Sequence, residues 1–559
     1  MTRLIATLIL FNAVAFAQLT ADQKIADFQS LSALYAKQYA PYEWKRTLFG
    51  FDLLETKSWL DRVRATKDDL EFYDLQVEYV ASLNDTHDSF SLPSDFVASL
   101  GMTVDIYDGK VLIDNITRSR LPVATYPFVV GDELVSVDGK PVEDLLKEFA
   151  KYSPQSNPRS ARRQTAARLV FRPQSRMPFA SRLGTAAMIV VKRDNGNLES
   201  YTIPWLKTGT PVFVGPVPSP KTAATARAAE SSEAPPDYMQ TLLELQHSGV
   251  SDDTGVLNYG SRTPIFALPS GFVQRQGTRA TDFFYSGTYQ SDGLRIGYIR
   301  IPNYSPPVQA TAVLDFEAEI AFFEANTDGL VVDEMRNTGG LLCFGENIAA
   351  RLIPYPFHAT GFAYRATWTR VNSFWNNLNS ARAQRADQWI IDLYEFLYND
   401  VSKSYMEQRG LTGPLPICTP SLDRQPAADN TGKIIAYSKP VVMVIDEFST
   451  STADSVPSMF QDAKRGPLFG YRTNGAGGTN TGFPAGAWSE GFAGMTLGLQ
   501  VRKAPVATTE FPTSAFIETV GVRPDIENDY MTRDNLLQGG RPFVAAFTAA
   551  IVEQIKKSK

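Results

Sequence analysis

The stretch "PVVMVIDEFSTSTADSVPSMFQDAKRG", residues 440–466, predicts a buried strand, a polar turn and a helix. Its apolar run has the length and composition of a strand covered on both faces, as in a parallel sheet. Serines and threonines crowd the point where this strand would lead into the helix. A serine there gains from the free N–H groups of the helix, either as a nucleophile or as an ordinary cap. The local pattern leaves Ser449, Ser451 and Ser455 open.

Similar units surround this stretch. Short apolar runs such as "LRIGYIRI" and "GLVVDEM" alternate with helical patterns, which predicts an α/β core with a largely parallel sheet over residues 286–530. An aromatic-rich, partly helical insertion at 345–430 interrupts the core. An insertion of that size is typical of a specificity element such as a lid. Residues 531–559 predict a C-terminal helix.

Three regions precede the core. Residues 18–91 have helical periodicity and end in the polar loop "NDTHDSF". Residues 92–206 alternate around Asp-Gly and Asn-Gly turns, as β-hairpins do, and contain an Arg/Ser-rich insertion. Residues 207–285 are rich in Pro, Ala and Ser at their start, which predicts a linker or flexible insertion.

The first residues, "MTRLIATLILFNAVAFA", combine a basic start, a short apolar run and an Ala-x-Ala end. This order is typical of an export signal, here residues 1–17, cleaved before Gln18. A membrane anchor is the alternative, although the apolar run is short for a bilayer. We therefore expect a secreted or periplasmic protein, with no membrane span once the signal is removed.

The composition is that of a soluble globular protein. The 559 residues are 43% hydrophobic and 20% charged, with a formal net charge of -6. No Lys/Arg-rich block is present, which disfavours a nucleic-acid partner. The two cysteines, Cys343 and Cys418, are too few for a disulfide scaffold and wrongly spaced for zinc, so we expect no metal and no cofactor. The spacing leaves open whether they form one disulfide.

A nucleophilic serine needs a base, and the chain has three histidines. His247 lies near the linker and predicts a surface position. His358 belongs to the aromatic insertion, which favours packing or a lid contact. His87 lies in a polar loop between acids that can orient an imidazole and stabilise its charged form, although a lone loop histidine is often incidental. Elsewhere, the glycine pair in "RNTGG" predicts either an ordinary turn or N–H donors for an oxyanion.

Six motifs, in order, resemble those of the serine peptidases of the C-terminal-processing and tricorn-core family. They are "LNDTHDSF", "GDELVSVDGKPV", "VVDEMRNTGG", "STSTADSVPSMFQDAKRG", "GYRTNGAGG" and "VGVRPDI". The resemblance covers roughly residues 27–525. It implies a mixed α/β multidomain fold: a ClpP/crotonase-like α/β catalytic core, an inserted PDZ-like β domain and an N-terminal helical region.

The resemblance places the nucleophile on Ser451, just before an acid that opens the helix, with Pro457 as an unusual residue that could kink the helix or delay its start. One branch of the family uses a lysine base, but Ala476 occupies that position. The tricorn-like branch uses a histidine preceded by a hydroxyl residue, which implies His87 with Thr86. A late acid completes its relay. Glu518 is the expected residue, with Glu510 and Asp525 as alternatives.

The same resemblance implies two backbone sites. The oxyanion hole would be the N–H group of Gly339 or Gly340 together with that of Thr452. The loop of the PDZ-like domain that receives a peptide's terminal carboxylate would comprise three residues: Leu100, Gly101 and Met102.

The expected function is therefore an exported serine endopeptidase acting on polypeptides, with a Ser-His-Glu relay. The alternative is a non-catalytic carrier of hydrophobic ligands or peptides on the same fold, as in retinoid-binding modules, for which the aromatic insertion would suit a pocket. A PDZ scaffold with an inactive core is a third hypothesis. The sequence leaves homo-oligomerisation open.

Overall fold

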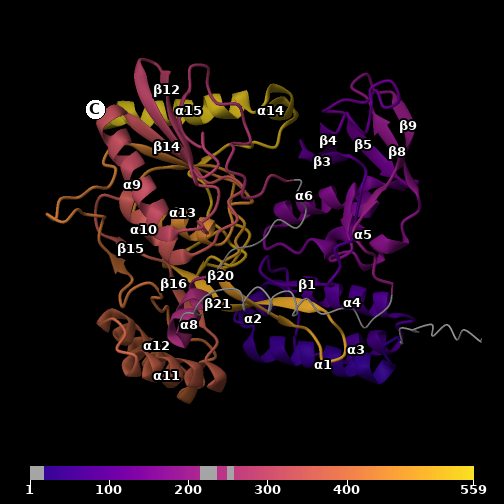
Figure 1. The fold of residues 1–559 in the computed structure, drawn as a ribbon, viewed down its shortest axis with the longest axis horizontal. Helices are drawn as coiled ribbons and strands as arrows, with labels where there is room; N and C mark the ends of the chain where they lie inside the picture. Colours follow the sequence, from indigo (N-terminus) through magenta and orange to yellow (C-terminus); the bar gives the residue numbers. More distant parts are fainter. Residues whose placement is uncertain (1–17, 214–235, 248–256) are drawn as a thin grey trace, which may run out of the picture.

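The computed structural model describes residues 18–213, 236–247 and 257–559. The expected export signal and part of the expected linker lie outside these residues. The N-terminal helices and the PDZ-like domain form one half of the molecule, and the α/β core forms the other (Figure 1). Within the described ranges, no helix is both long enough and apolar enough for a membrane span.

The core is built on one mixed sheet, as the alternating strand and helix patterns predict. Five neighbouring strands, β13 to β23 in the spatial order, are paired in parallel, and β11 and β12 add an antiparallel edge. The described strands, in spatial order, are β11 (Val273–Gln276), β12 (Tyr285–Ser291), β13 (Leu294–Arg300), β14 (Gly329–Asp333), β18 (Val441–Ile445), β19 (Leu468–Gly470) and β23 (Ile526–Glu527).

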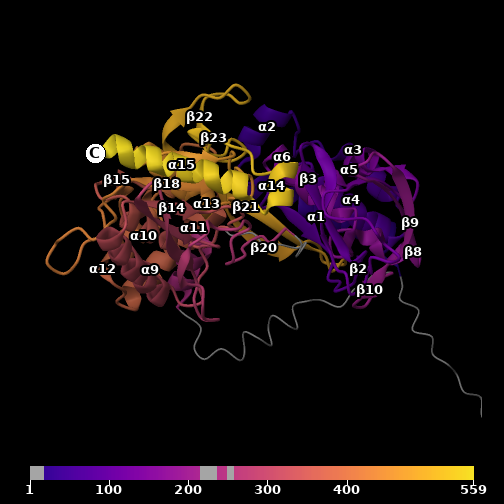
Figure 2. The same cartoon turned by 90° about the horizontal axis from the view of Figure 1, so that it is seen from above.

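Helices cover both faces of this sheet. On one face lie α9 (Gln309–Asn326), α10 (Leu342–Leu352) and α13 (Thr452–Asp462), and on the other lies α15 (Arg541–Ser558), as Figures 1 and 2 show. Successive side chains of β18 alternate between the two layers: Met443 packs with the first set and Val444 with α15. Burial on both faces explains the continuous apolar run of this strand.

The expected C-terminal helix is divided in two, because a glycine pair in the left-handed region separates α14 (Arg533–Gln538) from α15. The edge strand β11 lies inside the region expected to be a linker. Its sequence "VQRQ" has only one apolar residue, so no hydrophobic pattern marked it as a strand.

The N-terminal region is helical, as its periodicity predicts. Its helices are α1 (Ala21–Gln38), α2 (Tyr42–Phe49), α3 (Lys57–Arg64) and α4 (Asp69–Ala81). The core reaches into this half through a long hairpin, β20 (Gly478–Pro484) and β21 (Phe492–Val506) (Figure 1). Strand β1 (Ser89–Ser91), which directly follows the polar loop after α4, pairs with β21. This pairing fixes the polar loop against the core.

The PDZ-like domain contains two small sheets and two α-helices, α5 (Val142–Phe149) and α6 (Pro158–Arg168). The predicted hairpins are present. The six-stranded sheet comprises β3 (Met102–Tyr107), β4 (Lys110–Ile116), β5 (Glu133–Val137), β6 (Lys140–Pro141), β8 (Ala186–Lys192) and β9 (Leu198–Pro204). The smaller sheet comprises β2 (Val97–Ser99), β7 (Phe171–Pro173) and β10 (Leu206–Thr208). The Arg/Ser-rich insertion forms the largely buried helix α6.

The aromatic insertion contains an antiparallel helix pair, α11 (Trp368–Ala383) and α12 (Gln388–Met406), with α8 (Asp237–Gln246) packed against it. Strand β16 (Gly361–Tyr364) joins the insertion to β21. The two cysteines form a disulfide, Cys343–Cys418, with 5.3 Å between their Cα atoms. It links the start of α10 to the far end of the insertion.

Candidate active site

Ser451 occupies the turn between β18 and α13 with an unusual backbone. Its φ is 66°, in the left-handed region that non-glycine residues rarely adopt. Its N–H group donates to Asp454 Oδ2 at 2.6 Å, and Asp454 also accepts from Gly475 N and Ala476 N at 2.8 and 3.1 Å. These contacts stabilise the strained turn. The helix begins directly at the next residue, so Pro457, inside α13, does not delay its start.

The structure brings Ser451 and His87 into contact. The distance between Ser451 Oγ and His87 Nε2 is 3.0 Å, and both residues are buried. Ser449, in contrast, donates its hydroxyl to Glu334 O at 2.8 Å and accepts from the Asp446 N–H group, so it holds the turn together. Of the three serines that the sequence left open, Ser451 is therefore the one whose hydroxyl lies against an imidazole.

The other two histidines lie elsewhere. His247 follows the end of α8, and His358 lies on β15 (Phe357–His358), where its Nδ1 is 3.0 Å from Asp423 Oδ1. Both positions agree with the expectation that neither is a base for the serine.

Two carboxylates lie beside the imidazole. One ring nitrogen of His87, one carboxylate oxygen of Asp85 and one of Glu518 lie within 4.8 Å of one another. Of the alternative acids, Glu510 is exposed and pairs with arginines, and Asp525 accepts from the Leu468 N–H group. The structure therefore places Glu518, and not the alternatives, next to His87.

The carboxylates of Asp85, Asp88 and Glu518 are buried, which raises the free energy of their ionised forms. Burial first, and then the Asp85 carboxylate, raise the pKa of Glu518 to about 7, while the Lys45 ammonium acts in the opposite direction. Lys45 Nζ lies 2.6 Å from Glu518 Oε1, and both side chains are fully buried. Burial, together with the Asp85 charge, also raises the pKa of Asp88 well above its ordinary range.

The Thr86 hydroxyl, which the resemblance places in the relay, contacts a residue of the core and one of the PDZ-like domain. It bonds to Asn474 Oδ1 at 2.5 Å and accepts from the Ser156 N–H group at 2.8 Å. Two hydroxyls donate to Glu518 Oε1: that of Ser156, just before α6, at 2.8 Å, and that of Thr519 at 3.4 Å. Sequence reasoning missed Ser156 and Lys45. No local pattern marks either residue, because each reaches the site only through tertiary packing.

The glycine turn after β14 lies against the nucleophile turn. Gly340 has a φ of 141°, and its carbonyl accepts from Thr452 Oγ1 at 3.0 Å, so the two segments of the expected oxyanion hole are in contact. The N–H group of Gly339 donates a hydrogen bond to Asn337 Oδ1, at 2.8 Å, within its own turn. The Gly339 N–H group thus has an acceptor in this conformation.

The expected carboxylate loop of the PDZ-like domain already has partners within the chain. The Leu100 N–H group donates to Val170 O at 3.0 Å, and Met102 belongs to the β3–β4 ladder. Gly101 has a φ of 77°, and a Cβ atom there would meet the Arg120 side chain. In this conformation the Leu100 N–H group already donates to a carbonyl of the segment that follows α6.

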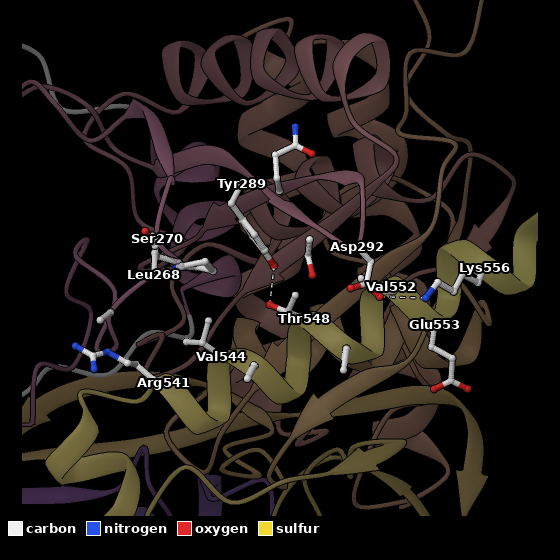
Figure 3. Close-up of a pocket in the computed structure, with 16 residues that line it drawn as sticks. Leu268, Ser270, Tyr289, Asp292, Arg541, Val544, Thr548, Val552, Glu553 and Lys556 are labelled. Atoms are coloured by element: carbon white, nitrogen blue, oxygen red, sulfur yellow. Dashed lines mark hydrogen bonds and ion pairs between the residues drawn. The ribbon is translucent and has the colours of Figure 1, made fainter.

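A cavity of about 720 Å³ lies between β12 and α15 (Figure 3). Tyr289 projects into it from the sheet, and its hydroxyl is 3.0 Å from Thr548 Oγ1 on the helix. None of the expected site residues lines this cavity. It is separate from the Ser451–His87 pair.

Comparisons with known proteins agree with this architecture. Residues 295–528 match the model of peptidase family S41, and residues 97–212 match a PDZ domain model. A protein of Chlamydia trachomatis serovar D is 24% identical over 584 residues, covering 93% of this chain and 91% of that protein. A protein of Chlamydia pneumoniae is 24% identical over 602 residues, with 97% and 92% covered.

Two solved structures share the fold over nearly the whole chain. Mature CPAF superposes with a TM-score of 0.74 at 22% identity, covering 96% of this chain and 98% of that chain. Mature CPAF complexed with lactacystin superposes with a TM-score of 0.73 at 22% identity, covering 96% and 99%.

Proposed function

We propose that the chain, which is a serine peptidase with a family S41 domain and a PDZ domain, is an endopeptidase whose nucleophile is Ser451 and whose base is His87. The observation that carries this proposal is the 3.0 Å contact between Ser451 Oγ and His87 Nε2 in a buried site. Such a contact is what a base needs to take the serine proton.

In the proposed reaction, His87 Nε2 accepts the proton from Ser451 Oγ as that oxygen attacks the substrate carbonyl carbon. The imidazolium then gives the proton to the leaving amine when the peptide C–N bond breaks, which leaves an acyl-enzyme. Water, deprotonated by His87, hydrolyses the ester and restores the serine. The Asp85 and Glu518 carboxylates stabilise the imidazolium formed in each half of the reaction.

The developing oxyanion would be bound by the N–H group of Gly339 or Gly340 together with that of Thr452. Thr452 is the first residue of α13, so the helix N-terminus adds a favourable dipole at this point. The contact between Thr452 Oγ1 and Gly340 O supports this assignment, because it fixes the two donor segments relative to each other.

A non-catalytic carrier on the same fold is disfavoured by this geometry. A carrier has no need of a serine in the left-handed region that contacts a buried imidazole. The same contact disfavours a scaffold with an inactive core.

Polypeptides are the proposed substrates, and secretion or the periplasm is the proposed location, from the predicted signal at residues 1–17. We also propose that the PDZ-like domain takes part in substrate recognition. Capture of a terminal carboxylate by Leu100 would require its bond to Val170 O to open.

The test is labelling with a serine-reactive fluorophosphonate and hydrolysis of an unfolded protein such as casein. Lactacystin is a second probe, because a structurally similar protein is known in complex with it. Both activities should be present in the mature chain, absent in Ser451→Ala and largely retained in Ser455→Ala. Persistent labelling of Ser451→Ala would show that the nucleophile is another residue.

A further inference from the structure

Lys45 is a fully buried lysine at the centre of α2. Its ammonium group contacts three oxygens: Glu518 Oε1 at 2.6 Å, Asn84 O at 2.5 Å and Thr519 Oγ1 at 2.7 Å. A lysine ammonium has three N–H donors, so these acceptors match its full capacity. The proposed reaction gives Lys45 no direct role, since Ser451 and His87 exchange the proton.

The three contacts join three separate segments. Lys45 belongs to α2, Asn84 belongs to the loop that carries His87, and Thr519 follows Glu518 in the chain. Asn84 and Thr519 both have positive φ values, 52° and 70°, and the latter is rare for a β-branched residue. The adjacent Trp44 adds a bond from its Nε1 to Glu518 O at 2.8 Å. Helix α2 therefore holds the loop that carries His87 against the turn that carries Glu518.

The surroundings of Glu518 also need a positive charge. The titratable groups near it, besides Lys45, are the carboxylates of Asp85 and Asp88, the His87 imidazole and the Tyr39 hydroxyl. The Ser156 hydroxyl and the Gly477 N–H group donate to its two oxygens but carry no charge. Neighbouring carboxylates repel each other when both are ionised, which favours protonation of one of them, and burial has the same effect. Against these groups, Lys45 is the cation in direct contact with the Glu518 carboxylate.

We propose that Lys45 is a positioning residue which keeps Glu518 ionised and holds it beside the His87 loop. This inference rests on the proposed function of Ser451 and His87. Its consequence is that the imidazolium formed during the reaction faces an anion and not a neutral carboxylic acid. The raised pKa of Glu518, about 7 even in the presence of the ammonium, shows how readily this carboxylate would take up a proton.

The first test is the pH profile of kcat/KM for Lys45→Met. Without the ammonium, Glu518 should be protonated to higher pH, so the acid limb should move upward by at least one pH unit. At pH values below the limb, kcat/KM should fall about tenfold for each pH unit by which the limb moves, and part of the activity should return at higher pH. Lys45→Arg, which keeps the charge, should keep the limb even where its rate is lower.

The matched control is Lys24→Met. Lys24 is also a buried lysine of the N-terminal helices, and its Nζ lies 3.3 Å from Asp69 Oδ1. This pair does not touch Glu518 or His87, so its loss can lower stability but should leave the pH limb in place. A double variant, Lys45→Met with Glu518→Gln, should show no further shift beyond Glu518→Gln alone, because the lysine acts through the acid.

A second readout does not depend on turnover. In Ser451→Ala protein, the Glu518 carboxyl can be titrated by infrared difference spectroscopy, with Glu518→Gln as the reference. The titration should move to higher pH in Lys45→Met, or in Lys45→Gln if the first variant does not fold. Wild-type protein that neither hydrolyses casein nor reacts with the probe would overturn the proposed function. An unmoved limb and an unmoved carboxyl titration would overturn the role of Lys45.

Discussion

Replacement of Asp454 by alanine tests the geometry of the nucleophile turn directly. Asp454 is fully buried, and its carboxylate accepts from three backbone N–H groups, those of Ser451, Gly475 and Ala476. The variant leaves all three donors without this acceptor. It also removes the contact that stabilises the left-handed backbone of Ser451.

The expected loss of stability follows from two opposing contributions. Three buried donors without an acceptor cost about 2 kcal/mol each, the middle of the usual range, and so about 6 kcal/mol together. Burial of the carboxylate raises its pKa from 3.8 to about 6, which means that its ionised form costs about 3 kcal/mol in the folded protein. That cost disappears in Asp454→Ala. The net loss at pH 8 should therefore be about 3 kcal/mol.

The raised pKa of Asp454 also determines how the stability difference between wild type and Asp454→Ala changes with pH. Because the folded pKa of Asp454 is raised, the native protein binds a proton that the unfolded chain releases, and wild-type stability gains as pH falls below 6. The alanine variant lacks this gain. The difference in stability between wild type and Asp454→Ala should be about 1 kcal/mol larger at pH 5 than at pH 8.

The assay is urea unfolding at both pH values, combined with the rate of fluorophosphonate labelling under native conditions. A folded Asp454→Ala protein should label at least about a hundredfold more slowly, because a displaced nucleophile loses alignment with its base. Glu71→Ala is the control: Glu71 occupies the same third position in α4, and its exposed carboxylate accepts a single N–H bond, from Lys67. Full labelling and unchanged stability in Asp454→Ala would refute this account of the turn.

Three further predictions concern the base, a buried acid and the domain contact. His87→Ala should remove nearly all hydrolysis, together with the acid limb of kcat/KM near neutral pH. The loss of kcat/KM should equal that in Ser451→Ala. Substantial turnover with an intact limb would mean that the base is another group. Burial raises the pKa of Glu334 from 4.5 to about 8, so its contribution to stability is present at low pH and fades as pH rises through 8. Glu334→Gln should remove about 2 kcal/mol from the difference in stability between pH 6 and pH 8, measured by urea unfolding, and an unchanged difference would contradict the raised pKa. Arg163→Met should lower the free energy of unfolding by about 3–5 kcal/mol, because the buried Asp105 and Glu447 carboxylates would lose their shared partner. A loss below about 1 kcal/mol would show that this contact between the PDZ-like domain and the core is dispensable.

Local patterns were sufficient for much of the fold. The apolar run at 441–445 predicted a doubly covered strand, and it is β18 in the parallel part of the core sheet. Asp108-Gly109 predicted the hairpin of β3 and β4. These features depend on side-chain periodicity and turn chemistry, which are properties of neighbouring residues. Strand β11 and helix α6 lacked such a pattern and were missed.

The site was only partly determined by sequence. Local patterns left three serines open, and the order of motifs favoured Ser451 with His87. These two residues are 364 positions apart in the chain, so no spacing rule could give their distance. The resemblance favoured Glu518 but left Glu510 and Asp525 open, and their burial and contacts separate the three only in the folded chain.

Other features belong to tertiary structure alone. Sequence identifies Lys45 and Ser156 as an ordinary helical lysine and an ordinary loop serine. They reach Glu518 only because α2 and the segment before α6 pack on the turn that carries Glu518. A buried charge has no signature in local sequence, since its cost and its compensation both depend on the groups that the fold brings within a few ångströms.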